Sequence, residues 1–202
     1  MINKALVITV ISFTFSFCGF AQAVEEHNNI APVAQPSLYS LRRLVSVAPL
    51  AFSENGVGFA VSYEQNIDRQ GIVAFQLPLL ATFNVAKNNA ANGYKNDPMV
   101  YFIPGIKFYP TGSYGPMKYA IGPSLLLGVG SKSTYNNGSY PSEGKFVLGI
   151  ILDNSLNMFL TPRFYLGFNL GFGFSYINIL GENNKGVTGL AQGSFKLGYR
   201  FQ

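Results

Sequence analysis

Residues 164–176 read Phe-Tyr-Leu-Gly-Phe-Asn-Leu-Gly-Phe-Gly-Phe-Ser-Tyr, and they alternate bulky apolar side chains with mostly small or polar ones. The bulky set is Phe164, Leu166, Phe168, Leu170, Phe172, Phe174 and Tyr176, and between them lie Tyr165, Gly167, Asn169, Gly171, Gly173 and Ser175. A period of two puts the two sets on opposite faces of a β-strand. Because the bulky face is rich in Phe and the other in Gly, Asn and Ser, we expect the bulky face to contact lipid.

The same period recurs along the chain and predicts eight strands, at residues 42–52, 56–66, 72–85, 99–110, 117–130, 145–160, 163–179 and 187–202. The first of these alternates poorly. Short turns alternate with longer polar connections along the chain, and only the short connection 53–56 departs from this order. An open sheet edge in hydrocarbon would leave backbone groups without partners, so the sheet must close. We therefore predict an all-β fold, a closed eight-stranded antiparallel up-and-down transmembrane β-barrel whose narrow interior is filled by side chains.

The N-terminal segment has the pattern of a secretory signal peptide, residues 1–23, with Lys4, an apolar run and the cleavage pattern Ala21-Gln22-Ala23. A lipoprotein signal acylated at Cys18 is the alternative, and the bulky Phe17 before it argues against it. Residues 24–40 are predicted to be a periplasmic leader, and residues 41–202 the barrel. The apolar run is too short for a membrane-spanning helix.

Charge and cysteine content exclude several functional classes. The formal net charge is +5, and the basic residues are scattered, so we expect no nucleic-acid partner. Cleavage after Ala23 removes the single cysteine, which leaves neither a disulfide framework nor a thiol nucleophile.

The last strand carries the residues on which a family resemblance rests. Its apolar face ends in Phe195, Leu197, Tyr199 and Phe201. With the signal pattern and the eight amphipathic strands, this ending resembles the small eight-stranded outer-membrane barrels of Gram-negative bacteria, and the loops and ending are also similar to Bacteroidetes-type barrels. The resemblance implies that these four residues form the signal read by the barrel-assembly machinery, although Gln202 follows the terminal aromatic. It also implies a monomer in contact with outer-membrane lipid and lipopolysaccharide, with extracellular loops and both termini in the periplasm.

Charged residues also fall on the face that should point inward. They are Glu64, Lys107, Lys118, Asp153, Lys196 and Arg200. Buried charges are costly unless they are paired, so we expect one hydrogen-bonded ionic network that fills the interior. A ligand site or an ion path is the alternative, and the surplus of basic residues favours a bound anion.

Four prolines form a second group, because they fall at similar heights on neighbouring predicted strands: Pro49, Pro78, Pro104 and Pro123. Proline cannot donate a hydrogen bond to its neighbouring strand. One interpretation is a belt of bulges that bends the wall. The other is a weakened seam that admits a lipid tail, as in the outer-membrane palmitoyltransferase barrels that this feature resembles.

Enzymatic functions find little support in the residues. The single histidine, His27, lies in the leader, the acidic residues are scattered, and we expect no metal and no cofactor. We therefore predict a non-enzymatic outer-membrane barrel with a structural or surface-interaction role. Two alternatives are a soluble, lipocalin-like barrel that binds an apolar ligand and a lipid-modifying enzyme reached through the prolines.

Overall fold

The computed structural model describes residues 43–68, 70–88, 93–110, 116–133, 142–181, 183–184 and 186–201. The predicted signal peptide 1–23 and leader 24–40 lie outside the described residues, as do Cys18, His27 and Gln202. No helix in the described ranges is long and apolar enough to cross a membrane.

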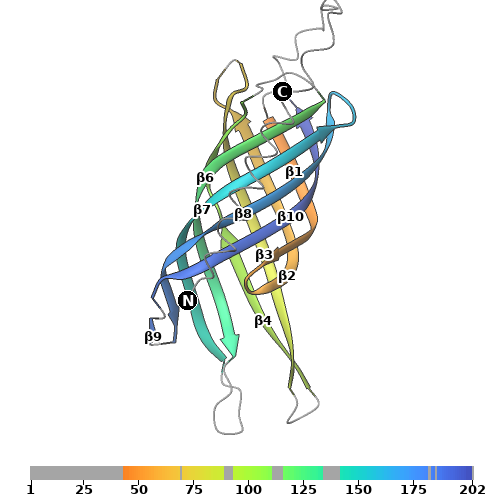
Figure 1. Ribbon diagram of the computed structural model, residues 1–202. Coiled ribbons are helices and arrows are strands. Elements are labelled where there is room, and N and C mark those ends of the chain that lie inside the picture. Colours follow the sequence, from red (N-terminus) through yellow and green to blue (C-terminus); the bar gives the residue numbers. More distant parts are fainter. Residues whose placement is uncertain are drawn as a thin grey trace, which may run out of the picture. The chain divides into compact units, whose positions relative to one another are not determined.

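The described chain forms β-strands that run one after another. They are β1 (Arg43–Ser53), β2 (Gly56–Asn66), β3 (Val73–Asn88), β4 (Gly93–Phe102), β5 (Gly105–Phe108), β6 (Met117–Ser133), β7 (Ser142–Phe159), β8 (Phe164–Leu180), β9 (Asn183–Asn184) and β10 (Thr188–Phe201). Every pairing is antiparallel, and β1 pairs with β10 as well as with β2, so the sheet closes on itself (Figure 1).

The wall of the barrel has eight strand positions. β4 and β5 both lie between β3 and β6 and are one strand interrupted at Ile103 and Pro104, and β9 only extends the hairpin between β8 and β10. The predicted closed eight-stranded antiparallel barrel is confirmed. The strand predicted at 99–110 begins earlier, at Gly93, and the other predicted ends differ from the observed ones by at most a few residues.

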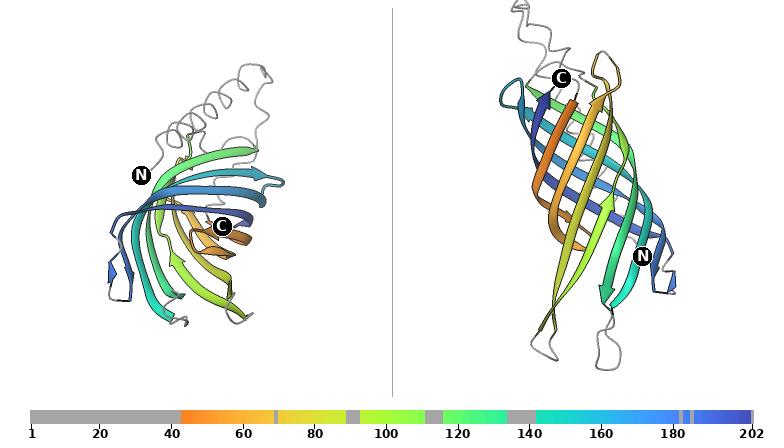
Figure 2. Two further views of the ribbon diagram at one scale, coloured as in Figure 1. Left: turned by 60° about the horizontal axis from the view of Figure 1, so that its bottom comes forward. Right: turned by 180° about the vertical axis from the view of Figure 1, so that it is seen from behind.

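Two rims bound the barrel, as two views show (Figure 2). The terminal rim is the end at which β1 begins and β10 ends, and it carries the turn between β2 and β3 that contains Asp68. The loop rim is the opposite end, where β1 turns into β2 at Glu54 and Asn55 and where β3 and β6 end.

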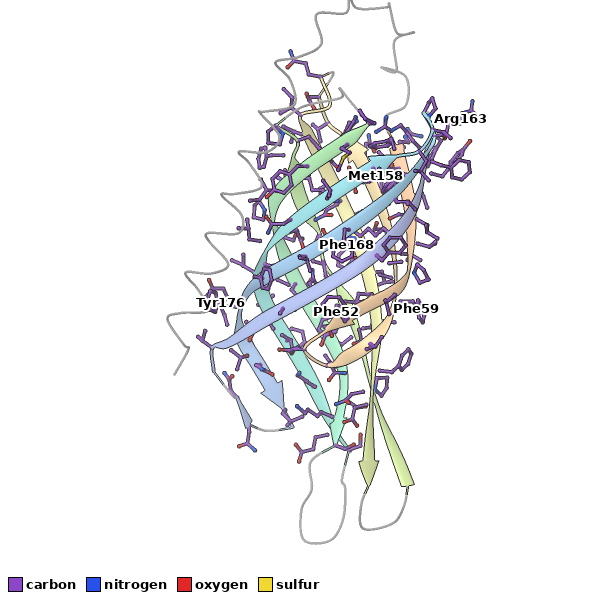
Figure 3. All side chains as sticks on the ribbon, turned by 45° about the vertical axis from the view of Figure 1, so that its right-hand side comes forward. Phe52, Phe59, Met158, Arg163, Phe168 and Tyr176 are labelled. Carbon is purple, nitrogen blue, oxygen red and sulfur yellow. The ribbon has the colours of Figure 1, made fainter. Side chains whose placement is uncertain are left out.

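Large apolar side chains point out of the wall along the strands. In β8 and β10, Phe168 is 51%, Phe172 42% and Leu197 43% exposed, which places all three outside rather than along the axis. Phe52 and Phe59 also project outward (Figure 3). An apolar belt of this kind costs free energy in water and is stable against hydrocarbon.

Toward the loop rim, the interior of the barrel is more apolar than the charged lining that the sequence predicts. A cluster of buried side chains occupies it, namely Ala48, Ala51, Ala60, Leu80, Met99, Tyr101, Ile103, Leu126, Val147, Ile151 and Leu190. An eight-stranded barrel leaves inside it only the width of packed side chains, and apolar groups fill this space without needing partners.

Two bulges interrupt the registers. β1 gains one residue relative to both neighbours between Ala48 and Ala51, and β8 gains one relative to β7 beyond Ser175. The extra residue turns both Pro49 and Leu50 outward, which explains why the first predicted strand alternates poorly.

Candidate functional site

The only ion pair among the six predicted interior charges lies toward the terminal rim. Lys107 Nζ donates to Glu64 Oε2 at 2.8 Å, and both side chains are buried. β3 runs between the two strands that carry them, and its small Ala74 lies opposite Lys107 and leaves room for the ammonium to cross. The Tyr109 hydroxyl donates to Glu64 Oε1 at 2.5 Å and accepts from Asn157 Nδ2 at 3.2 Å.

Two further cations lie beside this pair, against one aromatic ring. The guanidinium carbon of Arg200 is 4.1 Å from the centroid of Phe159, and Lys118 Nζ is 5.0 Å from it. Both cations are buried. A cation over a ring face is attracted by the quadrupole of the ring, but this is weaker than an ion pair in a desolvated site.

Asp153 sits deeper, at the centre of a second cluster whose hydrogen-bond donors are all neutral. Its Oδ2 accepts from Ser124 Oγ at 2.5 Å and from Gln76 Nε2 at 3.1 Å. Its Oδ1 accepts from Gln192 Nε2 at 3.2 Å and from Asn169 Nδ2 at 3.4 Å. Neutral donors from four strands therefore solvate this carboxylate.

The six predicted residues are all buried inside the barrel, but they do not form one network: Glu64, Lys107, Lys118, Asp153, Lys196 and Arg200. They divide into the group around Glu64 and the group around Asp153. The ammonium of Lys196 lies near Lys107, Asp153 and Glu64, between the two groups. The expected single network is therefore wrong, because no hydrogen bond among the described residues joins the Glu64 group to the Asp153 group.

A third polar group spans the loop rim. Lys145 Nζ of β7 donates to Glu54 Oε1 of the β1–β2 turn at 2.9 Å, and β7 lies across the barrel from β2. Asn55 Nδ2 donates to the Asp97 carbonyl at 2.9 Å, and Ser133 Oγ donates to Asp97 Oδ1 at 2.6 Å. Strands β7 and β4 thus hold the short turn in the mouth of the barrel, and β6 in turn bonds to Asp97 of β4.

Neither Lys145, the first residue of the predicted strand 145–160, nor Asp97, which precedes the predicted strand 99–110, is among the charges expected inside, whereas the structure buries both. A usable signal exists, because Lys145 shares the inward phase of Val147 and Ile151 on β7. The alternation alone does not show where a strand begins, and both β4 and β7 begin before their predicted first residues.

The arrangement offers little catalytic chemistry. Ser124 and Asp153 form a hydroxyl–carboxylate contact that sequence reasoning missed, but both are almost completely buried and the described residues contain no histidine. Among those residues, no group of three or more His, Cys, Asp or Glu side chains is arranged to hold a metal.

Two small cavities lie inside the wall. The larger, about 20 Å³, is bounded by small side chains such as Ser46, Ala48 and Ala60 and reaches Lys196. The smaller, about 10 Å³, lies at the terminal rim beside Lys118 and Arg200.

No protein-family model and no curated protein match this chain. Solved structures do match it. A major outer membrane protein from Thermus thermophilus aligns with a TM-score of 0.57 and 13% identity over 79% of this chain and 99% of its own. Ail, the attachment invasion locus protein of Yersinia pestis, aligns with 0.55 and 15% over 80% and 99%. Neisserial surface protein A aligns with 0.52 and 15% over 78% and 94%. The chain has the fold of the small eight-stranded outer-membrane β-barrels.

In this outer-membrane barrel fold, the predicted assembly signal forms the outward face of β10. Phe195, Leu197 and Tyr199 are exposed there, and Phe201 is half-buried opposite Arg43 at the terminal rim. These side chains therefore lie on the outside of the wall, beside the β1–β10 closure.

The four prolines are not a belt of bulges. Only Pro49 lies at a register shift, whereas the registers run unbroken past Pro78, Pro104 and Pro123. A proline nitrogen has no hydrogen to donate, so at these prolines the register continues with a ladder hydrogen bond missing rather than with an inserted residue.

Backbone hydrogen bonds continue around the interruption between β4 and β5. The Ile103 N–H donates to the Pro78 carbonyl at 2.9 Å, and the Leu125 N–H donates to the Pro104 carbonyl at 2.8 Å. These bonds tie β3, the broken strand and β6 together at the prolines.

Proposed function

We propose that this protein is an integral outer-membrane barrel without enzymatic activity or a conducting pore, which serves a structural or surface-interaction role. The observation that carries the proposal is the outward belt of large apolar side chains on every strand of the wall. Its loop rim faces the exterior and its terminal rim the periplasm. Its contacts are outer-membrane lipid and lipopolysaccharide, and during biogenesis the barrel-assembly machinery.

Two features support a closed interior. The apolar cluster around Tyr101, Ile103 and Ile151 occupies the space between the Asp153 group and the loop rim. Beyond it, Lys145 and Glu54 meet across the mouth. Apolar side chains in a narrow passage exclude ions, because an ion there would lose its hydration without gaining partners.

Fractionation tests the location. The protein should stay with outer membranes after high-salt washing and should leave them only with detergent. Release by salt alone would instead favour a soluble, lipocalin-like protein.

Conductance tests the closed interior. Pure protein in planar lipid bilayers should give no steady current, whereas the double variant Tyr101→Ala, Ile151→Ala should give measurable single-channel events, because it removes volume from the apolar cluster. Steady current through the wild type would contradict the closed interior.

Lipid analysis tests the absence of catalysis. Deletion of the gene should leave lipid A and phospholipid unchanged. An altered lipid that reappears with wild-type protein but not with Asp153→Asn would overturn the non-enzymatic assignment and support lipid modification.

A further inference from the structure

Two buried cations at the terminal rim have no acidic partner among the residues that the structure describes. Lys118 and Arg200 are 6% and 7% exposed, and both contact the ring of Phe159. Within the described residues, the ion pairs are Lys107 with Glu64 and Lys145 with Glu54, so neither cation takes part in one. The buried Nε of Arg200 has no hydrogen-bond acceptor.

Glu64 is the nearest acidic group in this region, and it is already engaged. One of its carboxylate oxygens accepts from Lys107 and the other accepts from Tyr109. The group formed by Glu64, Lys107, Lys118 and Arg200 therefore holds three positive charges and one negative charge. An unbalanced buried charge is costly, and a counter-ion would lower that cost.

A cavity lies beside these cations. Its lining includes Lys118, Phe159, Arg200, Tyr109 and the acidic Glu64, and it reaches Gly71 of the turn between β2 and β3. At about 10 Å³ the cavity has room for roughly one water-sized particle. Chloride is somewhat larger than a water molecule, whereas phosphate and sulfate are several times larger.

We propose that this cavity is a halide site, in which a chloride ion accepts hydrogen bonds from Arg200 and Lys118 and balances the surplus charge of the terminal rim. The ion would complete the coordination of the buried Nε. It would also tie β6 to β10, which carry the two cations.

Bromide, which scatters X-rays anomalously, is the probe for the site. Crystals of the detergent-solubilised mature protein grown in sodium bromide should give an anomalous peak between Arg200 and Lys118. The peak should be absent in Lys118→Gln and present in Lys132→Gln, a matched control near the other end of β6. No peak in the wild type would overturn the proposal.

Unfolding in lipid vesicles provides a readout in solution. At constant sodium concentration, replacing gluconate, which is too large for the cavity, by chloride should raise the urea midpoint of the wild type and of Lys132→Gln. The folding equilibrium constant should rise about tenfold when chloride reaches about nine times its dissociation constant.

Lys118→Gln should lose this chloride dependence. An equal response to chloride in all three proteins would overturn the proposal and indicate an adventitious ion only. A larger response to phosphate or to phosphatidylglycerol vesicles than to chloride would also overturn it, and would point to a free or lipid-borne phosphate instead.

Discussion

Single glycines on the inner face make room for tyrosine rings. A Cβ at Gly198 would lie 1.9 Å from a ring atom of Tyr165, which is itself buried. Gly198→Ala should therefore destabilise the barrel by about 1–3 kcal/mol, because the ring must leave its position in a closely packed interior. The urea midpoint in lipid vesicles measures this loss.

Gly189→Ala is the matched control on the same strand, since a Cβ there meets no atom within 4 Å. Its urea midpoint should stay close to that of the wild type. Equal effects of the two substitutions would show that lost backbone freedom, and not the Tyr165 ring, sets the cost at Gly198.

The turn between β2 and β3 depends on one carboxylate. Asp68 Oδ1 accepts from the Val73 N–H at 2.8 Å, and Oδ2 accepts from the N–H groups of Gln70 and Ile72 at 3.1 Å each. Partial burial acts to raise the pKa of Asp68, but these hydrogen bonds outweigh it and hold the pKa below its usual value. The ionised form therefore stabilises the folded state.

Acid should remove this stabilisation. Because the folded pKa lies below the unfolded value of about 3.9, the contribution is present above that pH and is lost as the pH falls through the folded pKa. Asp68→Asn should cost on the order of 1 kcal/mol at pH 7 and progressively less as the pH is lowered below about 4, measured by urea unfolding in vesicles. A difference that stays constant with pH would contradict this assignment.

At the scale of elements, the interruption between β4 and β5 decides whether the wall has a seam. The N–H groups of Ile103 and Leu125 donate to the carbonyls of Pro78 and Pro104, so both amides should be protected from deuterium exchange in nanodiscs. Their protection should match that of Leu156, which lies on a regular part of β7. Rapid exchange at Ile103 and Leu125 alone would support lipid entry at the prolines.

Strand faces were predictable where the alternation is long, and less so where the chain departs from it. β8 shows its inward and outward residues directly, from Phe164 to Phe174. The bulge at Pro49 was not predictable, because an extra residue is recognised only against a paired neighbour. The same limit applies to the prolines, since only the registers with both neighbouring strands show whether a proline coincides with a bulge.

At the scale of the whole molecule, the Lys145–Glu54 pair joins opposite sides of the mouth. Its side chains are 7% and 23% exposed, so water screens it only in part. A double-mutant cycle with Glu54→Gln and Lys145→Gln should give a coupling of about 1–2 kcal/mol that weakens in high salt. A coupling near zero at low salt would show that the pair does not hold the turn.

The sequence by itself determined the closed barrel, its strand number and its outward faces, because a period of two and the need to pair every backbone group in lipid leave few other arrangements. It also placed six of the charged residues on the inward face, although it missed Asp97 and Lys145. Only the tertiary structure decided which of them meet, such as Lys107 with Glu64 across Ala74, and which do not, such as Lys118 and Arg200. Alternation assigns a side chain to a face, whereas its partner depends on register and on the side chains that reach across the interior from other strands.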